Sequence, residues 1–135
     1  MDDEEPIVQM ATMLLQRLGF EVEQAHDGSE TVQKFTAAHR AGRSFDLVVM
    51  DLTVPGGMGG REAIEALPRI DPRVKAIVSS GYSSDPVLAN YRAYGFRGMV
   101  AKPYKIDDFT RVLREVLRES RPPMSGTRPG GSARN

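Results

Sequence analysis

The side chains that could carry out chemistry stand directly after short apolar runs. Asp51, Ser80 and Lys102 each follow such a run, and Asp2 with Asp3 stands ahead of the first amphipathic segment. Ligands of parallel α/β sheets bind outside the carboxyl ends of the strands. We therefore expect three carboxylates, a hydroxyl and an ammonium group to converge in one crevice.

This set of groups favours phosphoryl transfer to an aspartate. Carboxylates held close together resist ionisation, and a hard divalent cation such as Mg²⁺ relieves their repulsion. A carboxylate can attack phosphorus and form an acyl phosphate. An opposing lysine supplies a positive charge for a phosphoryl oxygen, and a serine hydroxyl can donate to another.

Short apolar runs alternate with amphipathic segments along the chain. The spacing predicts helices over residues 6–18, 30–39, 61–67, 86–94 and 106–118, and strands over residues 20–25, 47–50, 74–78 and 98–101. Strict alternation of this kind predicts an α/β fold, with a parallel sheet covered by helices on both faces.

Composition excludes several classes of function. Lys plus Arg equals Asp plus Glu, 18 each, so the chain has no electrostatic footprint for nucleic acid. It has no cysteine, and no run of about 18 apolar residues that would cross a membrane. The acidic start is unlike a signal peptide, so we expect a cytoplasmic protein. Residues 1–119 should form the domain, and the Pro-, Gly- and Arg-rich residues 120–135 a disordered tail.

Four short motifs, in order, carry a resemblance over about residues 2 to 118. They are Asp2-Asp3-Glu4, Met50-Asp51-Leu52-Thr53-Val54-Pro55-Gly56, Ser79-Ser80-Gly81 and Ala101-Lys102-Pro103. With these motifs the chain resembles the receiver domains of two-component response regulators and of hybrid histidine kinases. The resemblance implies a flavodoxin-like, doubly wound parallel sheet.

The resemblance also implies a role for each site residue. Asp51 resembles the phospho-acceptor, Asp3 a direct Mg²⁺ ligand and Asp2 a ligand acting through water. The carbonyl of Thr53 would complete the protein ligands of the metal, alongside Asp51. Lys102 resembles the lysine that pairs with the phosphate.

Three further positions concern the response to phosphorylation. Ser80 resembles the switch hydroxyl. Thr53 and Tyr82, two residues beyond the acceptor and the switch hydroxyl, stand where the family tunes the loss of phosphate. Met99 stands three residues before the lysine, where the family usually carries an aromatic residue, so a standard aromatic readout is not expected.

The function implied is that of a switch in a phosphorelay. A histidine kinase or a histidine phosphotransfer domain would supply the phosphoryl group, and slow self-hydrolysis would reset the switch, so the chain would not be a classical enzyme. Nucleic acid and membrane are not expected partners, and a weak homodimer is left open. The chain also resembles the receivers at the C-terminus of hybrid histidine kinases.

One element of the family pattern is missing from the sequence. A receiver sheet has five strands in the order 2-1-3-4-5, whereas this sequence supplies four, because only Met1 precedes the acidic pair. We expect the first, central strand to be absent, through truncation ahead of Met1, a misplaced start or decay of the gene. The alternative function is therefore a pseudo-receiver that is not phosphorylated and acts only in protein contacts. A dehalogenase-like phosphatase is a weaker rival, since that motif needs an acid where Thr53 stands.

Overall fold

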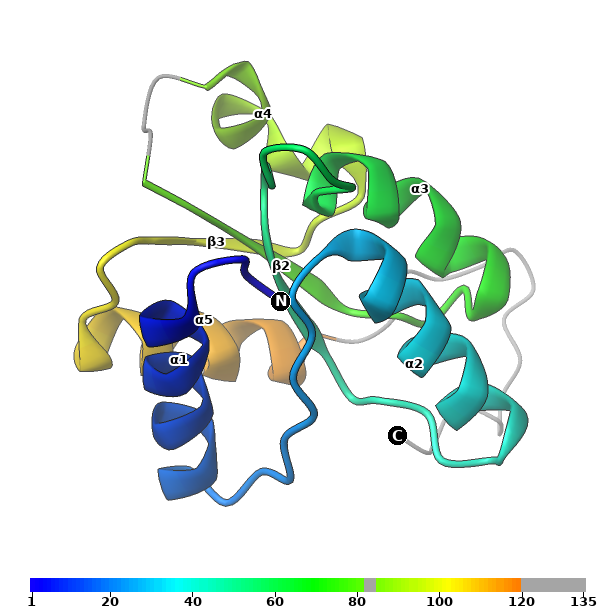
Figure 1. The fold of residues 1–135 in the computed structure, drawn as a ribbon. Helices are drawn as coiled ribbons and strands as arrows, with labels where there is room; N and C mark the ends of the chain where they lie inside the picture. Colours follow the sequence, from blue (N-terminus) through cyan, green and yellow to red (C-terminus); the bar gives the residue numbers. More distant parts are fainter. Residues whose placement is uncertain (82–84, 120–135) are drawn as a thin grey trace.

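A computed structural model describes residues 1–81 and 85–119, which form a three-layer α/β arrangement (Figure 1). The expected tail at residues 120–135 lies outside these described residues, as does Tyr82. In order along the chain the elements are α1 (Glu5–Arg17), α2 (Gly28–Arg40), β1 (Val48–Asp51), α3 (Gly60–Ile70), β2 (Ala76–Ser80), α4 (Pro86–Ala89), the 3₁₀ helix η1 (Tyr91–Tyr94), β3 (Gly98–Ala101) and α5 (Ile106–Arg118).

The sheet is parallel, as the alternation of elements predicts, with the strands in the order β1-β2-β3. Val48 pairs with Ala76 at one end of β1, and Asp51 pairs with Ser79 at the other. Figure 1 shows α1 and α5 together on one side of the sheet and α2 and α3 on the other. This confirms the doubly wound class and brings the carboxyl ends of the strands to one edge.

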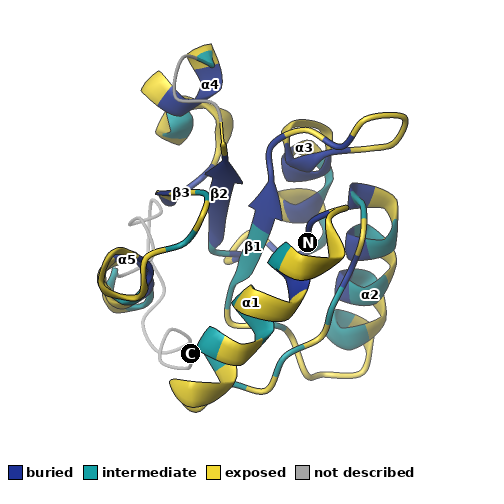
Figure 2. Ribbon diagram, turned by 60° about the vertical axis from the view of Figure 1, so that its left-hand side comes forward, coloured by how far each residue is buried: buried dark blue, intermediate teal, exposed yellow. Residues whose placement is uncertain are grey.

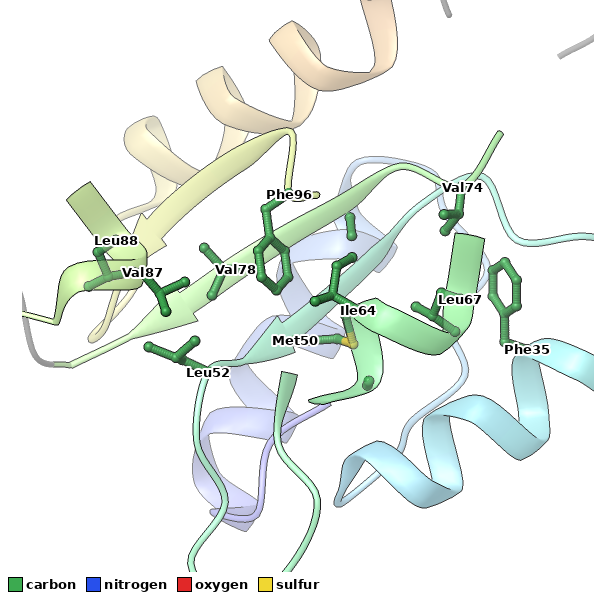
Figure 3. Packing of buried hydrophobic residues seen from close by; sticks show 12 residues of the cluster. Phe35, Met50, Leu52, Ile64, Leu67, Val74, Val78, Val87, Leu88 and Phe96 are labelled. Atoms are coloured by element: carbon green, nitrogen blue, oxygen red, sulfur yellow. The ribbon is translucent and has the colours of Figure 1, made fainter. Parts of the chain in front are cut away.

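Each face of the sheet carries its own apolar cluster. The cluster beneath α2 and α3 contains Phe35, Met50, Leu67, Val78 and Phe96, all nearly inaccessible to solvent (Figure 3). The cluster beneath α5 contains Ile77, Val100, Phe109, Val112, Leu113 and Val116. Alternate residues of β2 therefore point to opposite faces, as the pleat requires, and both faces are covered.

Most helix boundaries follow the sequence signals, and one helix is shorter than expected. Asp27 caps α2, because its carboxylate accepts from the N–H of Glu30 at 2.8 Å. The helix expected over residues 86–94 stops after Ala89 instead. Asn90 leaves helical geometry at φ −139° and ψ 46°, and η1 follows it. Asn is a weak helix former, which suits such a break.

The strand expected over residues 20–25 is a wrong prediction. This segment runs in an extended course beside α1 and α2, but it belongs to no sheet. Its backbone has one partner of the strand kind, the N–H of Asp2, which donates to the carbonyl of Ala25 at 3.2 Å. A strand needs a ladder of hydrogen bonds, and among residues 1–81 and 85–119 no strand pairs with residues 20–24 to supply one.

Of the helices described, none is both long and apolar enough to cross a membrane.

Candidate functional site

Backbone hydrogen bonds bring the predicted site residues to one edge of the sheet. The N–H of Leu52 donates to the carbonyl of Ser79 at 2.9 Å, and that of Lys102 donates to the carbonyl of Ser80 at 3.1 Å. These bonds continue the ladders past the last paired residues of β1 and β3. Asp51, Ser80 and Lys102 consequently follow one another across the carboxyl edge, as the sequence predicts.

The N-terminal residues add two carboxylates to this edge. The N–H of Asp51 donates to the carbonyl of Met1 at 2.9 Å, which places Asp2 and Asp3 beside the end of β1. One oxygen each from Asp2, Asp3 and Asp51 lie within 4.8 Å of one another. Asp2 is 2% exposed and Asp51 5% exposed, whereas Asp3 is open to solvent. Asp3 is thus the carboxylate that a ligand arriving from solvent meets first.

Lys102 is the positive charge of the site. Its ammonium donates to the carboxylate of Asp2 at 3.0 Å and lies 3.3 Å from an oxygen of Asp51. The second oxygen of Asp2 accepts from the N–H of Glu4 at 2.9 Å. Lys102 therefore bridges the two buried carboxylates and reduces the repulsion between them. The peptide bond from Lys102 to Pro103 is cis.

Burial and crowding hold a proton more firmly on Asp51 than on an ordinary aspartate. Loss of solvation is the largest cause, and the negative charge of Asp2 adds to it, so the pKa of Asp51 is raised to about 6. The opposing charge of Lys102 lowers this pKa but does not reverse the shift. At neutral pH the carboxylate is mostly ionised and poorly compensated, and is ready for a cation or an electrophile.

Two further groups at this site have no signal in the sequence. The ammonium of Met1 donates to the carbonyl of Val49 at 2.6 Å, and burial lowers its pKa to about 6. The hydroxyl of Tyr104 lies 2.8 Å from that of Ser79, and burial raises the pKa of Tyr104 to about 12. Met1 and Tyr104 stand beside the Asp2-Asp3-Glu4 and Ala101-Lys102-Pro103 motifs, but only the three-dimensional structure shows which groups they contact at the strand ends.

The glycine-rich loop after Asp51 lets α3 approach the backbone of the site. A Cβ on Gly60 would come within 2.7 Å of the carbonyl oxygen of Asp51, and one on Gly59 within 2.6 Å of that of Leu52. Larger residues at these positions would push the loop away from Asp51. Thr53 lies exposed in this loop, two residues beyond Asp51.

The residues expected to respond to phosphorylation have different surroundings. Ser80 is buried at the end of β2. Met99 stands on β3 with 38% of its surface exposed, so a flexible apolar side chain faces solvent where the family usually has an aromatic ring.

The carboxylate cluster suits Mg²⁺, which prefers hard oxygen ligands and keeps several waters. Asp2, Asp3 and Asp51 could hold the ion, and the exposed position of Asp3 leaves room for water. A cation here would replace part of the solvation that Asp51 has lost. The cluster therefore fits the metal that the sequence implies.

Mg²⁺ binding should weaken as the pH falls through about 6, since Asp51 must lose its proton to act as a ligand. With a pKa of about 6, the affinity at pH 5 should be roughly tenfold below that at pH 7.5. Isothermal titration calorimetry at both pH values measures the ratio. In Asp51→Asn the ratio should fall close to one, and an unchanged tenfold ratio in that variant would assign the titration to another group.

Comparisons with known proteins agree with this geometry. The family model of the response regulator receiver domain matches residues 1–114. The CAI-1 autoinducer sensor kinase/phosphatase CqsS of Vibrio cholerae is 33% identical over 105 residues, which are 76% of this chain and 14% of that protein. The chemotaxis protein CheY of Thermotoga maritima is 28% identical over 85% of this chain and 92% of its own.

Solved structures share the fold. A CheY-like receiver domain from Methanospirillum hungatei has a TM-score of 0.73 at 27% identity, covering 86% of this chain and 88% of its own. A chain of the CheX-CheY-BeF3-Mg+2 complex from Borrelia burgdorferi has a TM-score of 0.78 at 22% identity, covering 87% of this chain and 86% of its own. The chain spans about a seventh of the sensor kinase but nearly all of the Thermotoga CheY. The chain belongs to the response regulator receiver domain family.

Proposed function

We propose that this chain accepts a phosphoryl group on Asp51, with Mg²⁺ bound at Asp2, Asp3 and Asp51, and works as a switch in a two-component phosphorelay. The observation that carries the proposal is the cluster of three carboxylates bridged by Lys102 at the carboxyl edge of the sheet. Bound Mg²⁺ would neutralise charge on the carboxylates and on the phosphoryl oxygens.

The reaction is a displacement at phosphorus. A carboxylate oxygen of Asp51 forms a bond to phosphorus, and the bond from phosphorus to the imidazole nitrogen of the donor breaks. The product is an acyl phosphate, and the imidazole leaves as the neutral base or takes a proton from solvent. Hydrolysis of the acyl phosphate by water resets Asp51. The chain thus undergoes one phosphorylation event at a time and is not a classical enzyme.

The groups around Asp51 suit the product as well as the reactant. Lys102 can move its charge from Asp2 to a phosphoryl oxygen, since its ammonium already lies 3.3 Å from Asp51. Ser80, on the neighbouring strand end, is the proposed switch hydroxyl. The carbonyl of Thr53 is the proposed further metal ligand, while Thr53 and Tyr82 are the proposed tuning positions.

The donor is proposed to be a histidine kinase or a histidine phosphotransfer domain, because a phosphohistidine is the phosphoryl source that the receiver family uses. The absence of nucleic acid and membrane partners, a weak homodimer and a cytoplasmic location stay predictions. So does the assignment of residues 1–119 to the domain and 120–135 to a disordered tail.

Acetyl phosphate with Mg²⁺ tests the proposal directly. Intact mass spectrometry should show one added phosphate on the chain, and none on Asp51→Asn or in the presence of EDTA. Circular dichroism on each sample establishes that the variant is folded. A folded wild-type chain that gains no phosphate would reject the proposal.

That outcome would favour the alternative, a pseudo-receiver that acts only in protein contacts. One observation supports this second candidate: the backbone of residues 20–24 has no strand partner, so the fold is less complete than the doubly wound pattern implies.

A further inference from the structure

Residues 102–105 connect β3 to α5, and Lys102 stands at the start of this connection. The neighbouring strand β2 is buried along its whole length, whereas residues 102–105 are exposed or half-buried (Figure 2). Connections of this kind are generally more mobile than strands. The ammonium of Lys102 nevertheless lies 3.0 Å from Asp2 and 3.3 Å from Asp51. The place of this ammonium consequently depends on what holds the connection against the sheet.

Two contacts join the connection to consecutive residues of β2. The backbone N–H of Lys102 donates to the carbonyl of Ser80 at 3.1 Å. The hydroxyl of Tyr104 lies 2.8 Å from the hydroxyl of Ser79, and either can donate to the other. Because Ser79 pairs with Asp51 in the register of the sheet, the second contact is made beside the proposed phospho-acceptor. The short segment from Lys102 to Tyr104 is thus attached to β2 at both of its ends.

The surroundings of Tyr104 preserve this contact. Burial raises the pKa of Tyr104 to about 12, so the phenol keeps its proton at neutral pH. Its ring centroid lies 4.9 Å from that of Phe109, which fixes the ring from the side of α5. Ser79 is fully buried, so its hydroxyl cannot turn to solvent for another partner. Breaking a hydrogen bond to such a group is unfavourable, and the contact should persist.

We propose that Tyr104 is a positioning residue whose hydroxyl, bonded to Ser79, holds the connection against β2 and keeps the ammonium of Lys102 between Asp2 and Asp51. The hydroxyl is the feature that matters, because a phenylalanine ring would pack against α5 equally well. For its consequence in phosphoryl transfer the inference rests on the proposed function, in which Lys102 pairs with a phosphoryl oxygen.

Hydrogen exchange tests the attachment without Mg²⁺ or phosphate. Tyr104→Phe removes only the hydroxyl, and the amide of Lys102 should then exchange about fivefold faster, as expected for the loss of one hydrogen bond. The amide of Ile77, in the buried strand β2, should keep its wild-type rate, which separates local loosening from general destabilisation.

Two further variants make this exchange measurement specific. Ser79→Ala removes the other partner and should speed exchange at Lys102 by the same factor, and the double variant with Tyr104→Phe should show no additional increase. Tyr94→Phe is the matched control, because it also removes a phenol hydroxyl but from a side chain that is 40% exposed. It should leave the exchange rate at Lys102 unchanged.

The affinity for Mg²⁺ distinguishes a positioning role from a general loosening of the site. The ammonium of Lys102 competes with a cation for Asp2 and Asp51, so its displacement should strengthen Mg²⁺ binding. Isothermal titration calorimetry should show an affinity about threefold higher in Tyr104→Phe, and no further effect of this substitution in a Lys102→Met background. General loosening would instead weaken Mg²⁺ binding in both backgrounds.

The rate of phosphorylation connects the inference to the proposed function. With acetyl phosphate and saturating Mg²⁺, Tyr104→Phe should gain phosphate about tenfold more slowly than the wild type, because Lys102 is less well placed for a phosphoryl oxygen. Tyr94→Phe should react at the wild-type rate. Intact mass spectrometry over time measures both rates.

Four results would overturn the proposal. They are a wild-type exchange rate at Lys102 in Tyr104→Phe, an equal increase at Ile77, a fall in Mg²⁺ affinity or an equal rise in the Lys102→Met background, and phosphorylation of Tyr104→Phe as fast as that of the wild type. A wild-type chain that gains no phosphate would reject the proposed function instead. The exchange measurement, which involves neither phosphate nor Mg²⁺, would then decide the role of Tyr104.

Discussion

Lys102→Met should lower the free energy of unfolding by about 3 kcal/mol at pH 7.5 in the absence of Mg²⁺. The substitution removes the ammonium that bridges two buried carboxylates and leaves Asp2 and Asp51 facing each other uncompensated. Methionine fills a similar volume, so loss of charge rather than loss of packing should dominate. Urea unfolding followed by circular dichroism measures the difference.

At pH 5 the free energy of unfolding that Lys102→Met loses should be about half as large as at pH 7.5. The pKa of Asp51 is raised to about 6 in the folded chain, from an ordinary value of 3.8. A carboxyl with a raised folded-state pKa contributes its stability at low pH, and that contribution is lost as the pH rises through about 6. At pH 5 Asp51 is mostly protonated and no longer needs Lys102, so the pair with Asp2 remains as the main loss.

Lys102→Arg is the matched control, since it keeps the charge and should cost less than the methionine variant at pH 7.5. Saturating Mg²⁺ should restore much of the stability that Lys102→Met loses, because the cation takes over the neutralisation of the carboxylates. Equal losses at pH 5 and pH 7.5 would show that packing, and not charge, accounts for the role of this lysine.

The class of fold and the acidic site follow from local features that a sequence carries. Apolar runs of strand length end at Asp51, Ser80 and Lys102, and the parallel connections bring those ends together whatever the details of the loops. The same holds for Asp2 and Asp3, whose place depends only on the start of α1 beside β1. The fold class and the acidic site could be predicted because the apolar runs and the alternation of strands with helices are visible in short stretches of sequence.

The strand expected over residues 20–25 was wrong because its formation depends on something that is not local. Phe20 and Val22 have the residue types of a strand, but a strand exists only where another backbone pairs with it. Among the described residues, the backbone of Met1 and Asp2 pairs with this segment at Ala25 alone, through the N–H of Asp2.

The positions of Tyr104 and of the Met1 ammonium could not be predicted for a different reason. Met1 is placed by hydrogen bonds to Val49 and Asp51 of β1, and Tyr104 lies against Ser79 and Phe109. The pKa of each group is shifted by burial, which a single sequence does not reveal. The raised pKa of Asp51 has the same origin, since loss of solvation is its largest cause. Residue types at strand ends identify candidates, but their protonation depends on packing.

Phe109→Ala should destabilise the chain by about 3–5 kcal/mol, the cost of truncating a buried aromatic side chain. Phe109 is 1% exposed, and its ring centroid lies 4.9 Å from that of Tyr104. It belongs to the cluster by which α5 covers Ile77 and Val100 of the sheet. A domain of this size has a net stability of about 5–15 kcal/mol, so the variant should lose a large share of it. The thermal midpoint, followed by circular dichroism, should fall by about 10–20 °C.

Ile106→Ala is the control on the same helix, because Ile106 is 51% exposed and should change stability by about 0.5 kcal/mol or less. The contrast matters here because two partly buried residues of α1, Leu14 and Leu15, pack against the cluster beneath α5. If truncating Phe109 cost no more than truncating Ile106, α5 would not be fixed against the sheet, and Tyr104 and Lys102, which directly precede it, would lack the support that positions them at the site.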